Sequence, residues 1–203
     1  MTASRGRRPL SAAFLFLAAL FPLLALSPAS AESLPVPRFE SADCPFEVPE
    51  EARVRFGRLV VPAVRPYEPG DPTVSVAVLV LGSRSQTPRP DPVLYLEGGP
   101  GGPSLAYYED WLGSPILDHR EIILFDQRGV GCSSPDLSCP EIRTARQESG
   151  VPGLSGAEAE QRMLESARAC AARLRKNGID LGAFSTAESA RDLADLRQAL
   201  GIA

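Results

Sequence analysis

The sequence predicts an α/β fold in which antiparallel first strands lead into a parallel sheet with flanking helices. Two β-branched, apolar runs come first, at 54–61 and 73–81. Shorter apolar runs at 92–96 and 121–126 follow, each leading into a glycine-containing loop. The last third of the chain has the three- and four-residue apolar spacing of amphipathic helices. Strands first, with strand–loop–helix alternation afterwards, are typical of a mixed sheet that turns parallel.

The first 31 residues predict a secretory signal peptide. Three arginines lie within residues 1–8, residues 12–26 are apolar except for one proline, and an A-x-A cleavage site ends at Ala31. The apolar run is shorter than the roughly 20 residues that a transmembrane helix needs. We expect cleavage after Ala31, secretion or export to the periplasm, and no stable membrane association of the mature part. An arginine pair alone leaves the choice between general and twin-arginine export open.

Residues 32–203 have the length of one domain of ordinary size. The whole chain has a net charge of −4, which becomes −7 without the three arginines of the signal peptide. An acidic product without a basic cluster is a poor ligand for nucleic acid. The chain has one histidine and no C-x-x-C pair, so we expect no metal site. Nothing in the composition specifies an oligomeric state.

The first half is expected to consist of strands and loops. Residues 32–50 are rich in proline and acids, which predicts an extended lead-in over the surface. The two long strands follow, and the prolines and glycine between them predict a turn. After a polar loop, residues 92–96 predict a short buried strand. Residues 105–117 fit a short helix or an ordered loop, and another strand follows at 121–126.

The C-terminal third predicts two helices. Apolar side chains recur on one face of residues 157–176, and Gly178 ends this helix. The second helix is predicted to begin at Ser185, where Ser185 and Glu188 match a capping box. It is predicted to end at Gly201.

The most distinctive segment is the loop at 97–103, which reads EGGPGGP directly after a predicted strand. The carboxyl ends of strands are where α/β sheets bind ligands, and glycine lets a backbone approach a ligand closely. The loop has no lysine for a phosphate-binding P-loop, and its glycine register fails the dinucleotide pattern. We therefore expect a binding or catalytic site here and no cofactor.

A second distinctive segment ends the strand at 121–126, and further short motifs occur in a fixed order. The motifs are CPF at 44–46, LYLEGGPGG at 94–102, FDQRGVGCS at 125–133, LSCP at 137–140, GIDL at 178–181 and TAESARDLADLR at 186–197. In this order and spacing, from about residue 44 to 202, the set resembles the proline iminopeptidase and tripeptidyl aminopeptidase family of α/β-hydrolases.

The resemblance implies that residues 32–203 are the N-terminal portion of a single α/β-hydrolase domain. It also implies that the glycine loop is the oxyanion-hole side of an active site. There a backbone N–H stabilises the charge that develops on the substrate oxygen. Gly99 is the expected donor and Gly98 the second choice. Glu97, Pro100 and Gly101 would contact substrate or brace the loop.

The segment Asp126, Gln127, Arg128 and Gly129 would lie beside the glycine loop. The guanidinium of Arg128 is suited to a bidentate bond with a carboxylate. That carboxylate would come from the substrate, from Asp126 or from a neighbouring loop. We favour the structural role, in which the pair braces the loop.

The resemblance implies a secreted serine peptidase of the tripeptidyl aminopeptidase type, which releases short peptides or single residues from peptide N-termini. The family pattern places a G-x-S-x-G elbow, an acid and a histidine further along the chain. No G-x-S-x-G occurs in these 203 residues, and His119 precedes Asp126, which is the wrong order. We therefore expect a fragment that is inactive alone, with peptide substrate bound by the full-length protein. The alternatives are an esterase on the same fold and a non-catalytic exported remnant or binding protein.

All four cysteines follow the predicted cleavage site, and the residues alone allow three pairings. The resemblance implies a disulfide between Cys139 and Cys170. It also implies a partner for Cys44 at a position that is Phe56 here. A Cys44–Cys132 bond and a free buried thiol at each site are both open.

The resemblance further implies that the strand at 93–96 lies inside the complete sheet, beside a strand that this chain lacks. Its edge would then be bare, and bare apolar edges promote aggregation. We expect poor solubility of the isolated chain.

Overall fold

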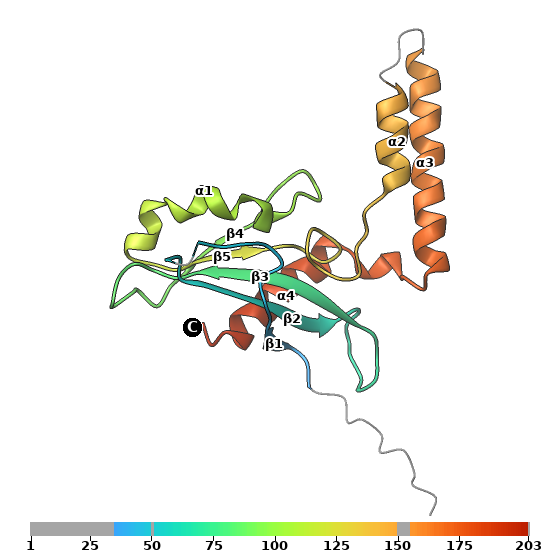
Figure 1. The fold of residues 1–203 in the computed structure, drawn as a ribbon. Helices are drawn as coiled ribbons and strands as arrows, with labels where there is room; N and C mark the ends of the chain where they lie inside the picture. The colour runs from blue at the N-terminus through green and yellow to red at the C-terminus, as the bar shows by residue number, and fades with distance from the viewer. Residues whose placement is uncertain (1–34, 50, 150–154, 203) are drawn as a thin grey trace, which may run out of the picture. The chain divides into compact units, whose positions relative to one another are not determined.

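The computed structural model of the chain describes residues 35–49, 51–149 and 155–202. All of them fall within one unit, Ser33–Ala203, and are drawn in colour in Figure 1. The predicted signal peptide and its cleavage site after Ala31 lie outside the described residues. Within the described part, no helix has the length and apolar character needed to cross a membrane.

The described strands form one mixed sheet: β1 (Arg38–Ser41), β2 (Val54–Pro62), β3 (Thr73–Leu81), β4 (Val93–Tyr95) and β5 (Ile122–Phe125). Their order across the sheet is β1-β2-β3-β5-β4. The first three pairs in this order are antiparallel, whereas β5 and β4 are parallel. The predicted α/β class, with an antiparallel start and a parallel continuation, is confirmed.

Two details of the strands differ from expectation. The extended lead-in contains β1, whose residues Arg38 to Ser41 pair with β2. Its sequence RFES has no clear apolar alternation, because an edge strand tolerates polar residues. β4 is not a buried strand: Leu94 is 37% exposed. The reason is that β4 pairs with β5 alone and so forms the opposite edge of the sheet.

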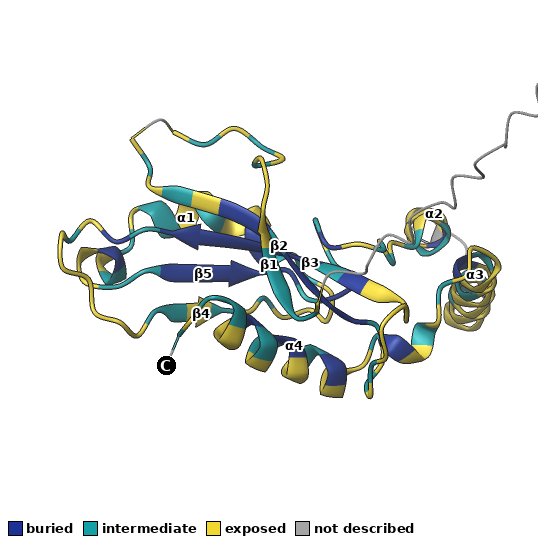
Figure 2. Ribbon diagram, turned by 90° about the horizontal axis from the view of Figure 1, so that it is seen from below, coloured by how far each residue is buried: buried dark blue, intermediate teal, exposed yellow. Residues whose placement is uncertain are grey.

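The sheet separates two hydrophobic clusters, since successive side chains of a strand point to opposite faces. The four valines of β3 face α4 (Thr186–Ala199), which contributes the fully buried Leu196. On the other face, Leu79 packs with Leu105 and Leu117, from the segment around α1 (Tyr108–Leu112). Figure 2 shows the buried strands between these two helices.

The segment predicted at 105–117 is a series of short helical turns. A 3₁₀ turn at Ser104–Tyr107 leads into α1, and a second one occupies Pro115–Asp118. The hydroxyl of Ser114 accepts a hydrogen bond from the N–H of Ile116 and so caps the second turn.

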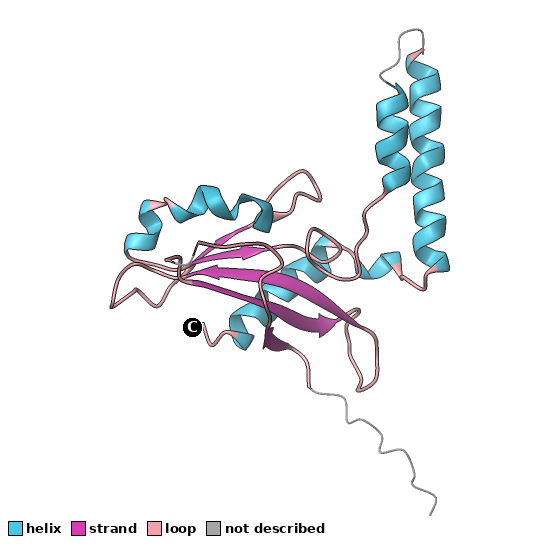
Figure 3. Ribbon diagram, viewed as in Figure 1, coloured by secondary structure: helices cyan, strands magenta, loops and turns pink. Residues whose placement is uncertain are grey.

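A helical hairpin follows β5. Its helices, α2 (Pro140–Ser149) and α3 (Gly156–Lys176), lie side by side (Figures 1 and 3). α3 was expected, and a capping box of Ser155 and Glu158 begins it. Its predicted apolar face is only partly covered: Cys170 and Leu174 are buried, whereas Leu164 is 45% exposed. α2 itself has too few apolar residues for a helical period, and the sequence does not predict it.

The last helix, α4, begins after Ser185, as predicted. The Ser185 hydroxyl accepts a hydrogen bond from the N–H of Glu188, which is one half of a capping box. The other half is absent, because the Glu188 carboxylate binds Arg65 and Arg191 instead. Gly201, with φ of 67°, follows the helix end.

Candidate functional site

Two loops meet at the carboxyl ends of the parallel strands. The glycine loop follows β4 and the Asp126 loop follows β5, and Tyr95 of β4 pairs with Leu124 of β5. Since parallel strands end at the same sheet edge, the two loops are neighbours. A Cβ atom on Gly131 would lie 2.8 Å from Cβ of Pro103, which shows how closely the loops approach.

The glycine loop is closed by hydrogen bonds within it. The N–H of Gly102 donates to the carbonyl of Gly98 at 2.9 Å, and the N–H of Gly98 donates to Oε1 of Glu97 at 2.9 Å. The N–H of Glu97 donates to Oγ of Ser104, also at 2.9 Å, which ties the loop to the next turn. Among the described residues, the N–H of Gly99 has no hydrogen-bond partner.

These hydrogen bonds distinguish between the two candidate oxyanion donors, the N–H groups of Gly98 and Gly99. The N–H of Gly98 is already satisfied by Glu97, whereas that of Gly99 is available to a ligand. Gly99 has φ of 122° and Gly101 has φ of 91°, so both need the conformational freedom of glycine. Pro100, between them, is exposed and has no N–H to offer.

Asp126 holds the two loops together. Its Oδ1 accepts from the N–H of Leu105 at 2.9 Å, and its Oδ2 accepts from the N–H of Cys132 at 2.9 Å. The side chain is fully buried. Burial raises the pKa of Asp126 above its ordinary value, and the backbone donors oppose that rise. Asp126 is therefore a brace between loops and is not exposed to a ligand.

Arg128 makes a bidentate bond to a carboxylate, and that carboxylate belongs to Asp192 on α4. Nε donates to Oδ2 at 2.7 Å and Nη2 donates to Oδ1 at 2.6 Å. The guanidinium also donates to the carbonyls of Pro62, Ala63 and Ala183. With its side chain 1% exposed, Arg128 has no free face for substrate. Asp126 is not its partner.

The remaining predicted residues of this loop shape its turns. The carbonyl of Gln127 accepts from the N–H of Val130 at 3.0 Å. Gly129 has φ of 78°, and a Cβ there would lie 2.6 Å from Cδ1 of Leu137. Gly129 thus allows the chain to pass close beneath Leu137.

Sequence reasoning missed a cluster of charged groups around Arg65. This residue lies in the turn between β2 and β3 and binds Glu188, Asp192 and Asp195 of α4. Asp192 is shared with Arg128, so one carboxylate connects the β2–β3 turn, the Asp126 loop and α4. The three acids recur at spacings of three and four residues, which is a helical face, but nothing local identifies Arg65 as their partner.

The cysteines divide into a bonded and a free pair. Cys139 and Cys170 form the disulfide that the resemblance implied, with 5.5 Å between their Cα atoms. Cys44 and Cys132 are not bonded: both carry free, half-buried thiols beside the same hydrophobic cluster. Burial raises the pKa of each thiol, so both are protonated and unreactive at neutral pH. Of the two alternatives that the sequence left open for Cys44 and Cys132, the structure has the free thiols.

One group of potential metal ligands occurs among the described residues, formed by Cys139, Glu141 and Cys170. Its two sulfurs are joined in the disulfide, so they offer no thiolate, and Glu141 is bound to Arg173 at 2.6 Å. The group serves to fasten α2 to α3.

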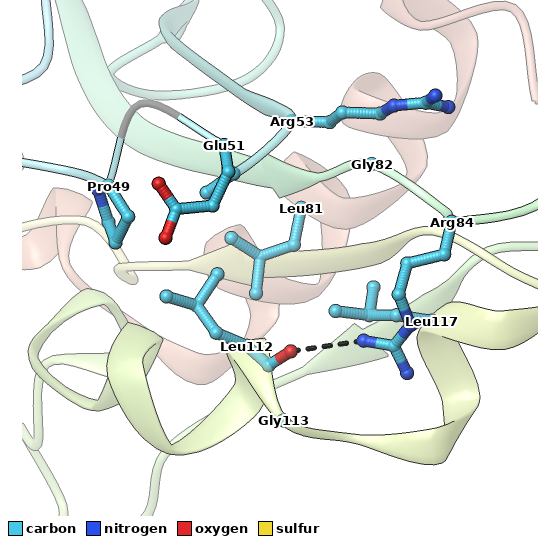
Figure 4. Close-up of a pocket in the computed structure, with 10 residues that line it drawn as sticks. Pro49, Glu51, Arg53, Leu81, Gly82, Arg84, Leu112, Gly113 and Leu117 are labelled. Carbon is cyan, nitrogen blue, oxygen red and sulfur yellow. Dashed lines mark hydrogen bonds between the residues drawn. The ribbon is translucent and has the colours of Figure 1, made fainter.

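A pocket of ≈ 490 Å³ lies at the other end of the sheet (Figure 4). Leu81, Leu112 and Leu117 form its apolar part, and Arg84 at its rim donates to the carbonyl of Leu112 at 3.1 Å. Leu81 pairs with Ile122, the first residue of β5, so this pocket lies at the amino ends of the parallel strands. His119 is also at this end, and it is not near the glycine loop.

In comparisons with known proteins, the chain is similar to hydrolases and peptidases. A family model described as "alpha/beta hydrolase fold" matches residues 91–203. A probable proline iminopeptidase of Leptolyngbya boryana is 37% identical over 87 residues, which is 43% of this chain and 26% of that protein. A proline iminopeptidase of Arabidopsis thaliana is 35% identical over 100 residues, 47% of this chain and 25% of that protein.

A third relative is the putative hydrolase YuaR of Escherichia coli (strain K12). It is 31% identical over 133 residues, which is 64% of this chain and 24% of that protein. The chain therefore spans about a quarter of the length of these curated relatives.

Proposed function

The chain belongs to the alpha/beta hydrolase fold family, and from that premise we propose that it supplies the oxyanion side of a serine peptidase acting on peptide N-termini. The observation that carries the proposal is the N–H of Gly99. It has no partner among the described residues and lies in a loop at the carboxyl end of β4. A donor held in this way stabilises the negative oxygen of a tetrahedral intermediate, and removal of one such donor costs about 10²–10³ in rate.

The braces around the glycine loop support this role. An oxyanion donor stabilises a transition state only if it does not have to move during the reaction. Ser104 fixes the loop at Glu97, and Asp126 fixes the following turn at Leu105. The Arg128–Asp192 pair fixes the neighbouring loop to α4.

The nucleophile, acid and histidine would come from sequence outside these 203 residues. No G-x-S-x-G occurs here, and the serines closest to the loops have structural roles. Ser104 accepts from the N–H of Glu97, and Ser133 donates to the carbonyl of Asp126 at 2.8 Å. Both serines are buried. The chain alone is therefore proposed to be inactive, as the N-terminal portion of one catalytic domain.

The substrate class rests on the relatives. Two of them are named proline iminopeptidases, which supports release of amino-terminal residues. The tripeptidyl type and export are further parts of the proposal. Export is supported by the predicted signal peptide and by the Cys139–Cys170 disulfide, since disulfides persist in oxidising compartments.

The test uses the coding sequence continued beyond Ala203, beside the 203-residue chain. The longer product should be labelled by a fluorophosphonate, and the chain alone should not. The longer product should release p-nitroaniline from proline or tripeptide p-nitroanilides with free amino groups, and much less from N-acetylated ones. Faster cleavage of p-nitrophenyl esters than of any anilide would favour an esterase. Absence of labelling in the longer product would refute the proposal.

A further inference from the structure

A groove of ≈ 670 Å³ lies between the end of β4 and α1, beside the glycine loop. Three aromatic residues line it, Tyr95, Tyr107 and Trp111, together with the acids Glu97 and Asp110. None of its lining residues is basic. The rings of Tyr95 and Trp111 are in contact, with 4.8 Å between their centroids and 54° between their planes. The groove thus combines aromatic surfaces with uncompensated negative charge.

Two hydrogen bonds keep the carboxylate of Glu97 ionised. The Glu97 carboxylate accepts from the hydroxyl of Tyr95 and from the N–H of Gly98. These two donors lower the pKa of Glu97, so it is ionised at neutral pH. The hydrogen bond to Glu97 raises the pKa of Tyr95, and the fields of Tyr107 and Asp110 act in the same direction. The Tyr95 hydroxyl therefore stays protonated as a donor.

We infer that this groove binds a protonated organic amine. A cation over an aromatic ring is attracted by the negative face of the ring, and the carboxylates of Glu97 and Asp110 add a charge of opposite sign. An anion would be repelled by both acids, and a neutral apolar ligand would remove their hydration without replacing it. An ammonium group is the ligand that satisfies the rings and the acids together.

The identity of the amine rests on the proposed function. Glu97 precedes Gly98 and Gly99 directly, and consecutive Cα atoms of a peptide are about 3.8 Å apart. A peptide whose carbonyl reached the N–H of Gly99 would therefore place only its first few residues near the groove. The amine would be the amino terminus of that peptide, so the groove would favour cleavage close to a free amino end.

The test uses the fluorescence of Trp111, the single tryptophan of the chain. The full chain is titrated with prolinamide, which is protonated at neutral pH, and with N-acetylprolinamide, which is neutral. Prolinamide should change the emission saturably, and the acetylated compound should not. In the Asp110→Asn variant, the Kd for prolinamide should rise about three- to fivefold, as for other exposed charge pairs. Circular dichroism checks that this variant, at an exposed position, is folded.

The matched control is Glu109→Gln, which removes the same charge one residue earlier from a side chain that does not line the groove. Its Kd should stay within about twofold of the wild type. Equal responses to the two compounds, no saturable response, or equal effects of the two variants would overturn the inference. Each of these results leaves the proposed peptidase intact if the longer product reacts with a fluorophosphonate. Amine binding without that reaction would refute the peptidase and support the groove.

Discussion

At the scale of single residues, the site depends on the hydrogen bonds that the buried carboxylate of Asp126 accepts. A buried carboxylate is costly unless hydrogen bonds offset its lost hydration. Here the N–H groups of Leu105 and Cys132 each donate to one oxygen at 2.9 Å. The second donor reaches Asp126 because Gly131, just before Cys132, has no side chain. A Cβ there would lie 2.1 Å from Oδ2 of Asp126.

The first prediction concerns Gly131. Its φ of 57° is unfavourable for other residues, and an added methyl group would collide with Asp126 and Pro103. Gly131→Ala should therefore lower the free energy of unfolding by about 2–4 kcal/mol, from backbone strain and overpacking together. Urea denaturation followed by circular dichroism measures the change.

The control for this prediction is Gly156→Ala, at the first position of α3. A Cβ there meets nothing within 4 Å, and alanine favours a helix. This substitution should leave the stability unchanged or slightly higher. Equal losses in the two variants would show that the close approach of Gly131 to Asp126 does not constrain the loop.

The sequence motifs identify the residues of the site, but they do not identify the groups to which those residues form hydrogen bonds. The glycine loop and the Asp126 segment are recognisable because each is a continuous pattern. The partner of Arg128 is Asp192, 64 residues later, and the position of that acid relative to the loop depends on how α4 packs. Which glycine N–H is free depends in turn on the Glu97 side chain, which folds back onto Gly98. Neither contact leaves a local signal in the sequence.

At the scale of elements, the α2–α3 hairpin depends on a covalent bond. Few side chains are buried between its helices, and those of Ala145, Cys170 and Leu174 are the main ones. The Glu141–Arg173 ion pair is partly exposed and contributes little. The Cys139–Cys170 disulfide joins the residue before α2 to the middle of α3, with a separation of 31 residues. The hairpin should therefore be sensitive to reduction.

The second prediction follows from that disulfide. A Cys139→Ser, Cys170→Ser double variant should lose about 2–4 kcal/mol of stability, because the unfolded chain regains the entropy that the closed loop removes. The loss should be seen as earlier unfolding of helical signal by circular dichroism. Dithiothreitol should have the same effect on the wild type and none on the variant. Cys44→Ser, which breaks no bond, is the control and should lose less.

The third prediction concerns the attachment of α4. Burial opposes ionisation of Glu188, but hydrogen bonds from Arg65 and Arg191 outweigh it, so the pKa of Glu188 lies below its usual value of 4.5. A lowered pKa in the folded state means that the stabilisation is complete above pH 4.5 and is lost as the pH falls through the lowered value. Glu188→Gln should cost about 1–3 kcal/mol at pH 7.

The measurement for α4 is the melting temperature between pH 7 and pH 3. The difference between wild type and Glu188→Gln should shrink as the pH falls below the usual pKa of a glutamate. Glu160→Gln, at an exposed position of α3, should melt like the wild type throughout. A difference that stays constant down to pH 3 would mean that the ionised Glu188 does not hold α4 against Arg65.

The elements with a clear hydrophobic period were predictable, and those without one were not. The bounds of β3 follow from its run of β-branched and apolar residues, and those of α3 follow from the three- and four-residue spacing of its apolar residues. α2 packs on α3 beside the disulfide, although its residues PEIRTARQES include only two aliphatic side chains, Ile142 and Ala145. The predicted capping box at Ser185 is half formed, because Glu188 has a stronger partner in Arg65 than in the helix terminus. Long-range charge pairing overrides the local pattern there.

At the scale of the whole molecule, the sheet has two different edges among the described strands. β1 carries the sequence RFES at one edge, where Arg38 and Glu40 are ion-paired at 2.6 Å. Charged side chains at an edge discourage pairing with another chain. β4 forms the other edge; its Leu94 is 37% exposed, and Leu96, just after the strand, is 40% exposed. This second edge lies directly before the glycine loop.

The last prediction is that the chain self-associates through β4. An apolar strand with unpaired backbone groups favours pairing with a second copy, so residues 32–203 should elute as dimers or larger species in size exclusion with light scattering. Leu94→Lys should shift them towards the monomer, because a charge on the edge must be desolvated on pairing. Leu164→Lys makes the same change on α3, at a leucine that is 45% exposed against 37% for Leu94, and should not shift the distribution. If the unaltered residues 32–203 are monomeric and melt cooperatively, the exposed edge is not an association site, and β4 is shielded in solution by its own flanking loops.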